Sequence, residues 1–285
     1  MKICRFNDNR LGVVIDDRVH DVSAVLNDLP ALRWPVAPGD QVIANLETLR
    51  PRIDAIAADG EVHDVGSIDL LSPVGNPSKI IGAPINYQAH IDEAKADPDL
   101  LQDRVIKSIS DWGLFLKATS SLVGASEGVA LRFLNRRNDH EMEFAVVIGK
   151  PGNNISYDNA LEHVAGYAIG FDMTLRGPEL LSWRKSIESY AVLGPWLVTA
   201  DEIPDPSDIE FKLTVNGEVR QHASTKSLDY DIPRLIAYAS THYTLHPGDI
   251  ILTGSPEGVA PVEPGDVMVA EAAGIGRMEI KVRAA

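Results

Sequence analysis

Cysteine is almost absent from this 285-residue sequence, which contains a single one, Cys4. One thiol cannot form a disulfide within the chain, so a disulfide-stapled fold is excluded and a reducing compartment is expected. No apolar run approaches the ~18 residues that a membrane span needs, and the first residues lack the apolar core of a secretory signal. We therefore expect a cytoplasmic protein that does not bind a membrane.

Positive charge is also scarce, because 26 Lys and Arg residues face 41 Asp and Glu residues and the formal net charge is -15. Nucleic acids and anionic membranes attract clusters of Lys and Arg, so neither is an expected partner. Hydrophobic residues make up 45% of the chain and charged residues 24%. This composition is typical of an ordinary globular protein that is long enough to bury a sizeable core.

The pattern along the chain predicts an α+β protein that is mostly β, with two domains. Residues 1–73 alternate short strand-like pieces, "LGVVI" and "RVHDV", with a helical pattern, "QVIANLETLRPRIDAIAA", and predict a small N-terminal α/β domain. Residues 74–285 carry many short β-branched runs separated by Gly and Pro, which predict a mostly β domain.

Two helices are expected in this second part, over "YQAHIDEAKADPDLLQDRVIKSI", interrupted by Pro98, and over "DIPRLIAYASTHY". Asp231 can cap the latter helix, with Pro233 in its first turn. Three Pro-Gly-Asp tripeptides, starting at Pro38, Pro247 and Pro264, precede apolar runs and predict type II turns.

Two glutamates stand at the start of an apolar run in "DHEMEFAVVIG". Residues two apart in a strand point to the same face, so Glu141 and Glu143 would project together while Met142 and Phe144 face the other side. Parallel carboxylates repel each other unless water, a basic side chain or a metal ion neutralises them. The spacing alone leaves both a solvated strand end and a metal site open.

A third acid, Asp172, ends another apolar run, "HVAGYAIGFD", where a strand would finish. Three carboxylates without a Cys or His ligand favour a hard cation with oxygen ligands, Mg²⁺ or Mn²⁺, with Ca²⁺ as a further candidate, over Zn²⁺. The interpretation as a metal site therefore gains support from Asp172, although spacing does not prove it.

From about Lys79 to Ile280 the chain resembles the fumarylacetoacetate hydrolase family, in particular its shorter members that cleave acylpyruvates. The family pattern Asp-x-Glu-x-Glu is matched by Asp139, Glu141 and Glu143, and its third metal acid by Asp172 in "DMTLR". Further landmarks follow in order: "NYQAH", "LFLKATSSLVG", "LGPWLVTADEIPDP", "VNGEVRQ" and "LHPGDIILTGSPEGV". The resemblance implies a mixed β-sandwich roll with a small N-terminal domain, a divalent metal and a homodimer.

By this resemblance, His90 and Glu93 lie on a mobile lid and activate water, and Lys185 acts on the substrate. On a helix, His90 and Glu93 would be neighbours, so the carboxylate could orient the imidazole for general-base catalysis. The same spacing also fits a solvated pair on a helix surface, which is the commoner case. Their assignment as catalytic residues therefore rests on the resemblance.

The resemblance also assigns substrate contacts. Thr253 and Gly254 match the Thr-Gly-Thr-Pro loop that binds the substrate carboxylate in the family, and Ser255 keeps the hydroxyl of the second Thr. An Arg of the family motif is matched by Arg176, whereas a substrate-binding Gln of many relatives is replaced by Glu179. A carboxylate there would repel an anionic substrate unless it is protonated or paired with a basic residue.

Two other positions depart from the family pattern, where Phe171 replaces an Asn and Gly177 replaces an Asp. These departures put the identity of the substrate in doubt but leave the metal acids intact. Three arginines precede the first two metal acids and fit either a distal substrate carboxylate or a solvated turn: Arg132, Arg136 and Arg137.

The reaction implied by the resemblance is metal-dependent hydrolysis of a C–C bond in a 2,4-dioxo acid, such as acetyl-, fumaryl- or maleylpyruvate, to pyruvate and a second acid. An alternative on the same scaffold is an isomerase or decarboxylase of a 2-oxo or 2-hydroxy dienoic diacid in the breakdown of aromatic compounds. A third alternative is a metal-binding scaffold without activity. The sequence does not decide which group is attached to the pyruvate half.

Overall fold

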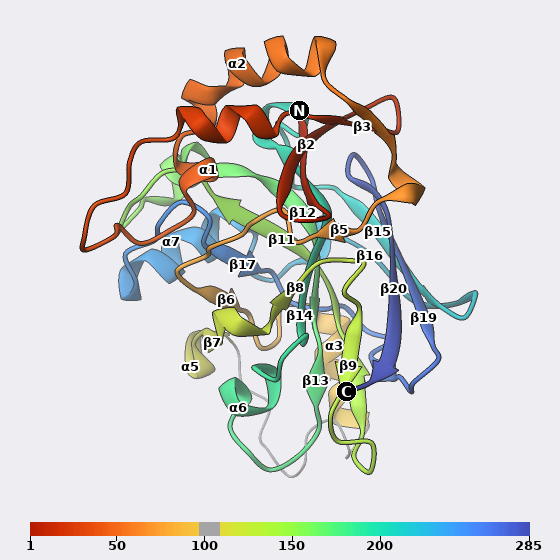
Figure 1. Cartoon of the computed structure of the whole chain (residues 1–285). Helices are drawn as coiled ribbons and strands as arrows, with labels where there is room; N and C mark the ends of the chain where they lie inside the picture. Colours follow the sequence, from red (N-terminus) through yellow and green to blue (C-terminus); the bar gives the residue numbers. More distant parts are fainter. Residues whose placement is uncertain (97–108) are drawn as a thin grey trace.

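The computed structural model of the chain describes residues 1–96 and 109–285. Strands dominate it and form one large sheet and two smaller ones, so the α+β, mostly β class is confirmed (Figure 1). The main path through the large sheet has the order β4 (Val62–Asp64), β3 (Arg18–Asp21), β2 (Arg10–Ile15), β1 (Lys2–Phe6), β14 (Ala191–Thr199), β12 (Val164–Asp172), β11 (Met142–Ile148), β17 (Ile250–Leu252), β6 (Ile80–Gly82) and β7 (Phe115–Lys117). Two short strands pair beside this path: β5 (Leu70–Leu71) and β8 (Leu122–Val123).

The first strands of the chain continue the large sheet. β1 pairs antiparallel with β14, with Lys2 opposite Val198 and Ile3 opposite Leu197. The predicted strand pieces "LGVVI" and "RVHDV" are found in β2 and β3. The division into domains at residue 73 stays a prediction, since the N-terminal strands have their own small apolar cluster and also share a sheet with the rest of the chain.

The second sheet packs against one face of the large sheet. Its strands are β16 (Glu218–Ser224), β15 (Glu210–Val215), β19 (Val267–Ala272), β20 (Gly276–Ala284) and β9 (Val129–Leu131). Phe144 of β11 and Phe211 of β15 belong to one buried apolar cluster, which shows that the two sheets share a core. A three-stranded sheet completes the fold: β13 (Thr174–Leu175), β10 (Asn138–His140) and β18 (Ala260–Pro261).

Helices lie around the sheets. They are α1 (Gln41–Ala44), α2 (Leu46–Asp59), α3 (Gln88–Ala96), α5 (Ile109–Trp112), α6 (Leu181–Lys185) and α7 (Ile232–His242). Figure 1 places α3 and α6 at the end of the molecule opposite α2. Short 3-10 turns cover Ser23–Asp28, Val65–Ser67, Thr119–Ser121, Tyr157–His163, Ala200–Glu202 and Thr225–Ser227. Among the described residues, no helix is long and apolar enough to cross a membrane.

Several local predictions are confirmed. The Asp231 side chain accepts a hydrogen bond from the Arg234 backbone N–H at 2.9 Å and caps α7. In the three Pro-Gly-Asp turns the glycines have φ values of +108° at Gly39, +85° at Gly248 and +104° at Gly265, as a type II turn requires. The predicted helix around residues 87–109 is present as α3, while its part at 97–108, including Pro98, lies outside the described residues.

The apolar run that follows the glutamates forms a strand with both faces buried. Met142, Phe144, Val146 and Ile148 face the core shared with the second sheet, whereas the alternate residues join another buried cluster. This explains why β11 is apolar on both sides and shows that the predicted alternation is correct. A charged residue in this strand can therefore persist only with dedicated partners.

Candidate metal centre

The three predicted metal acids meet at one edge of the large sheet. Glu141 lies between β10 and β11, Glu143 lies in β11, and Asp172 is the last residue of β12. The Asp172 backbone N–H donates to the Glu141 carbonyl at 2.9 Å, which fixes the two chains beside each other. One carboxylate oxygen of each acid lies within 4.8 Å of the others, and all three residues are buried. The structure thus excludes the solvated strand end.

Two buried lysines hold this acidic cluster together. Lys185, at the end of α6, donates from Nζ to Glu141 Oε2 at 2.7 Å and also to Asp172. Lys117, the last residue of β7, donates to the other oxygen of Asp172. Although burial opposes its charged form, the neighbouring Asp172 and Glu141 carboxylates raise the pKa of Lys185. Both lysines are therefore parts of the site rather than surface residues.

Glu143 differs from its neighbours, because a backbone group donates to its carboxylate. The Gly254 N–H donates to Glu143 Oε2 at 2.5 Å. Burial, and next the negative charge of Asp172, raise the pKa of Glu143 well above its ordinary value. A buried carboxylate whose charge is this unfavourable is a suitable ligand for a cation, which would supply the missing positive charge.

Arginines orient the outer side of the cluster. Arg176 donates from Nε to Asp139 Oδ2 and from Nη2 to Glu141 Oε1, each at 2.7 Å. Arg137 adds a hydrogen bond to Asp139 at 2.8 Å. Burial opposes the ionised form of Glu141, but the charges of Lys185 and Arg176 lower its pKa and keep the carboxylate ionised. Arg176, predicted to contact the substrate, thus contacts a predicted metal ligand; its role toward a substrate stays a prediction.

His90 and Glu93 form the predicted pair on α3. Nδ1 of His90 lies 2.9 Å from Glu93 Oε2, and the Gly258 backbone N–H donates to Glu93 Oε1 at 2.8 Å. Burial opposes ionisation, yet the hydrogen bonds from His90 and Gly258 lower the pKa of Glu93. An ionised Glu93 accepts the proton on Nδ1, which leaves Nε2 as the basic nitrogen of the ring. His90 is 7% exposed and Glu93 is partly buried, so the pair does not lie on a fully solvated helix surface.

The predicted substrate loop, residues 253–256, is tied to the predicted metal strand, which is β11 together with Glu141 just before it. The Thr253 hydroxyl donates to the Phe144 carbonyl at 2.8 Å, and Ser255 Oγ donates to the Met142 carbonyl at 3.0 Å. Gly254 has φ +101°, and a Cβ added there would lie 2.7 Å from the Asn86 Cβ. Thr253 and Gly254 therefore have donors engaged within the protein, and their contact with a substrate stays a prediction.

Glu179 is paired, which answers the question raised by its charge. Nη1 and Nη2 of Arg136 donate to its two carboxylate oxygens at 2.9 and 2.8 Å. These hydrogen bonds lower the pKa of Glu179 to about 2. A Cβ added at Gly177 would collide with the Arg136 guanidinium. The departures at Gly177 and Glu179 thus belong to one feature, the Arg136–Glu179 salt bridge, which leaves no room for a side chain at Gly177. A substrate contact of Glu179 stays a prediction.

The third departure, Phe171, is a core residue. It is fully buried and lies opposite Met142 in the pairing of β11 with β12. It contributes packing next to the acids rather than a polar group.

Sequence reasoning missed two buried polar residues of this region, Lys117 and Gln221. Lys117 lies in "LFLKATSSLVG" and Gln221 in "VNGEVRQ", both quoted as landmarks without a role. A lysine next to an apolar strand piece, with a partner 55 residues away, gives no local pattern.

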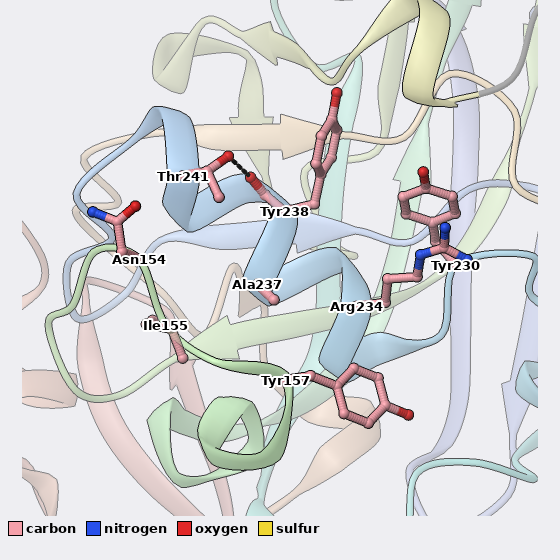
Figure 2. A pocket seen from close by; sticks show the side chains of 8 residues that line it. All are labelled: Asn154, Ile155, Tyr157, Tyr230, Arg234, Ala237, Tyr238 and Thr241. Carbon is pink, nitrogen blue, oxygen red and sulfur yellow. Dashed lines mark hydrogen bonds between the residues drawn. The ribbon is translucent and has the colours of Figure 1, made fainter.

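The structure also contains a surface hollow of about 560 Å³ beside α7, lined by side chains that include Tyr230, Arg234 and Tyr238 (Figure 2). The metal acids do not line it.

Comparison with known proteins defines the class. The family model for the fumarylacetoacetate (FAA) hydrolase C-terminal region matches residues 79–283, and the chain belongs to this family. It is 52% identical over 285 residues to a maleylpyruvate hydrolase of Aquipseudomonas alcaligenes, covering 99% of both chains.

Solved structures and more distant relatives agree with this class. The fold superimposes with a TM-score of 0.84 on maleylpyruvate hydrolase from Sphingobium sp. SYK-6, solved in complex with manganese(II) ion and pyruvate; the identity is 36%, and the match covers 100% of this chain and 99% of that one. The Escherichia coli 4-hydroxyphenylacetate degradation bifunctional isomerase/decarboxylase is 34% identical over 262 residues, 90% of this chain and 58% of that protein.

Proposed function

We propose that this protein is a hydrolase of the acylpyruvate type that converts maleylpyruvate and water into maleate and pyruvate, and that it uses a divalent metal ion. The observation that carries the proposal is the buried cluster of Glu141, Glu143 and Asp172, with the His90–Glu93 pair close enough for His90 to act electrostatically on Glu141. Identity of 52% over the whole chain to a maleylpyruvate hydrolase supports the choice of substrate.

The residues present fit a metal ion with oxygen ligands. Glu141, Glu143 and Asp172 would hold it, since their donor set contains only carboxylate oxygens, which Mg²⁺ and Mn²⁺ prefer. A bound divalent ion would supply positive charge next to the oxo acid end of the substrate, where negative charge develops when the C–C bond breaks. The manganese(II) ion in the Sphingobium relative supports this assignment.

The residues of the chain would divide the remaining work. Glu93 holds the proton on His90 Nδ1, so Nε2 is free to take a proton from water that attacks the C4 carbonyl. The electron pair of the broken C3–C4 bond moves to the pyruvate half, which then takes up a proton. Lys185, with its ammonium group beside two of the acids, can stabilise the developing negative charge.

A second candidate is isomerisation or decarboxylation of an oxo dienoic diacid, which the relationship to the E. coli isomerase/decarboxylase supports. Both reactions generate negative charge next to a carboxylate and an oxo group, so the same acids and lysines would serve. The hydrogen bond between His90 and Glu93 favours hydrolysis, because it suits His90 to act as a general base and hydrolysis consumes a water molecule.

The proposal is tested with the purified Mn²⁺-loaded protein and a panel of acetyl-, fumaryl- and maleylpyruvate, with mass analysis of the products. We expect pyruvate plus a second acid, whose masses together exceed that of the substrate by the mass of one water, and maleylpyruvate as the preferred substrate. A product of unchanged mass, or loss of carbon dioxide from a dienoic diacid, would favour the second candidate. No turnover of any compound would contradict both and leave the metal-binding scaffold.

A homodimer, expected from the resemblance, is part of the proposal. Large apolar side chains are exposed at Phe133, Leu134, Leu180 and Trp183, which a partner chain could cover. Mass measurement in solution by light scattering would give twice the 30.9 kDa of one chain if the dimer forms.

A further inference from the structure

Gln221 connects the metal strand to the substrate loop through four hydrogen-bond contacts. It lies in β16 of the second sheet, where the pairing of β15 with β16 shifts register beside it. Its neighbours Arg220 and His222 are exposed, whereas Gln221 is 1% exposed and points into the protein. A bulge of this kind re-aims one side chain of a strand.

On one side, Gln221 contacts the strand that carries the metal acids. Its Oε1 accepts a hydrogen bond from the Met142 backbone N–H at 3.0 Å, and Met142 stands between Glu141 and Glu143. The same oxygen lies 3.3 Å from His140 Nδ1. Gln221 thus fixes the backbone at the point where two of the predicted ligands leave it.

On the other side, Gln221 contacts the loop predicted to bind the substrate. Its Nε2 donates to Ser255 Oγ at 2.8 Å and to the Pro256 carbonyl at 2.9 Å. The Ser255 hydroxyl donates a hydrogen bond to the Met142 carbonyl at 3.0 Å. This bond closes a ring of hydrogen bonds between the strand, the Gln221 amide and the loop. Every polar atom of the Gln221 side chain is used.

The ring also sets the tautomer of His140. Because both hydrogens of Gln221 Nε2 are donated to the loop, Oε1 is an acceptor and His140 must carry its proton on Nδ1. Replacing Gln221 would therefore leave the Met142 N–H and the His140 Nδ1–H without an acceptor. On the loop side, Ser255 Oγ and the Pro256 carbonyl would lose their donor. Leaving buried polar groups unpaired costs more than the hydrogen bonds alone.

We propose that Gln221 is a positioning residue of the reaction, which keeps the metal strand and the 253–256 loop in register so that ligands and substrate donors face one another. It touches no carboxylate oxygen of the predicted metal ligands and neither of the predicted substrate-binding residues Thr253 and Gly254; it acts through Met142, Ser255 and Pro256. The inference rests on the proposed function, since it assigns the loop to the substrate and the strand to the metal.

Two variants separate the two sides of the ring. In Gln221→Glu, a carboxylate oxygen still accepts from Met142, but the other oxygen meets the Ser255 lone pairs and the Pro256 carbonyl, so the loop side is lost. In Gln221→Met, the shape is retained and both sides are lost. His222→Gln is the matched control, because His222 is the next residue of β16 and its contact is the exposed Glu210 at 2.8 Å.

The experiment measures KM and kcat for maleylpyruvate, the Kd of Mn²⁺ by electron paramagnetic resonance of the free ion, and the Tm of each full-length variant. For Gln221→Glu we expect a KM raised by about tenfold or more with a Mn²⁺ Kd within about threefold of wild type. For Gln221→Met we expect both KM and the Mn²⁺ Kd to rise by about tenfold. His222→Gln should match the wild type in all of them.

Variants that lower only Tm, with wild-type KM and Mn²⁺ Kd at a temperature where they are folded, would overturn the proposal and leave Gln221 a merely structural residue. If Gln221→Met does not fold, the KM of Gln221→Glu decides. If the wild type does not hydrolyse maleylpyruvate, the proposed function fails separately. The Mn²⁺ Kd of Gln221→Met against wild type then decides whether Gln221 positions the metal strand.

Discussion

The ammonium group of Lys117 hydrogen-bonds to the carboxylate of Asp172, and both side chains are buried. Lys185 binds the other oxygen of Asp172, so this carboxylate lies between two lysines. Asp172 has a lysine at each carboxylate oxygen and needs no further partner for its charge. Glu143 lacks such compensation, because burial and the charge of Asp172 disfavour its ionised form. The site therefore combines one acid that is held in place with one whose negative charge is unfavourable, as we propose for a metal ligand.

Replacing Lys117 by Met should make the protein more dependent on metal. Without metal, we expect a loss of about 1–3 kcal/mol in the free energy of unfolding, because Asp172 loses a buried charged partner. Addition of Mn²⁺ should raise Tm more than it does in the wild type, since the cluster has become more negative. Thermal unfolding with and without Mn²⁺ measures both effects.

Lys95→Met is the control for this change, because Lys95 is exposed and its ion pair with Asp92 at 3.4 Å lies on the surface of α3. It should leave Tm within about 1 °C of wild type. Equal Mn²⁺-induced shifts in Lys117→Met and wild type would show that Lys117 does not contribute to the charge of the metal centre.

Glu143→Gln should stabilise the metal-free protein and abolish its response to Mn²⁺. Folding raises the pKa of Glu143 above the ordinary 4.5, so the folded state of the wild type loses stability as the pH rises through this value toward the raised pKa. The amide keeps an oxygen for the Gly254 N–H but carries no charge. We therefore expect a higher Tm than wild type at pH 7 and a difference that shrinks below pH 4.5.

Glu47→Gln, at an exposed position in the first turn of α2, is the matched surface control. A Glu143→Gln variant that is less stable than wild type at pH 7 without metal, or one that still gains stability from Mn²⁺, would contradict the assignment of Glu143 as an uncompensated metal ligand.

Glu93→Gln should lower kcat by about 10²- to 10³-fold with little change in KM. The amide oxygen would stay on the Gly258 N–H, so its NH₂ group would face His90 Nδ1 and force the proton onto Nε2. That tautomer cannot accept a proton from water. Steady-state kinetics with saturating Mn²⁺ measure the effect.

The matched control is Asp92→Asn, the same chemical change one residue earlier on the exposed face of α3. It should retain wild-type kcat within about twofold. If Glu93→Gln also retained it, neither Glu93 nor the His90 tautomer would matter for the chemical step.

Gly254→Ala should distort the 253–256 loop. The residue has φ +101°, which L side chains rarely adopt, and the new Cβ would lie 2.7 Å from that of Asn86. We expect a cost of about 1–3 kcal/mol in the free energy of unfolding and a raised KM. Gly66→Ala is the control, because a Cβ at Gly66 meets no described atom within 4 Å; equal Tm and KM values for the two variants would contradict the steric argument.

The sequence predicted the parts of the site that follow local periodicity. Alternation placed Glu141 and Glu143 together, the end of an apolar run placed Asp172, and helical spacing placed His90 beside Glu93. Spacing alone could not exclude that Glu141 and Glu143 lie at a solvated strand end, because local spacing contains no information on burial. The resemblance to a family, later matched over residues 79–283, supplied that missing information.

Contacts between distant segments could not be predicted in this way. Lys117 reaches Asp172 across 55 residues, and Gln221 reaches Met142 across 79 residues. Pairing of β1 with β14, close to two hundred residues apart in sequence, likewise has no local pattern. Such contacts depend on the packed fold, in which the partner of a charge is chosen by topology rather than by spacing.

Hydrolysis of maleylpyruvate should require a metal ion held by the acidic cluster. The most direct measurement is the initial rate of pyruvate release, with quantification of maleate, in the presence of Mn²⁺, after excess chelator, and after Mn²⁺ is restored. We predict equimolar pyruvate and maleate, loss of the rate on chelation and its recovery with Mn²⁺. Release at an unchanged rate in chelator, or no release with Mn²⁺ present, would contradict it.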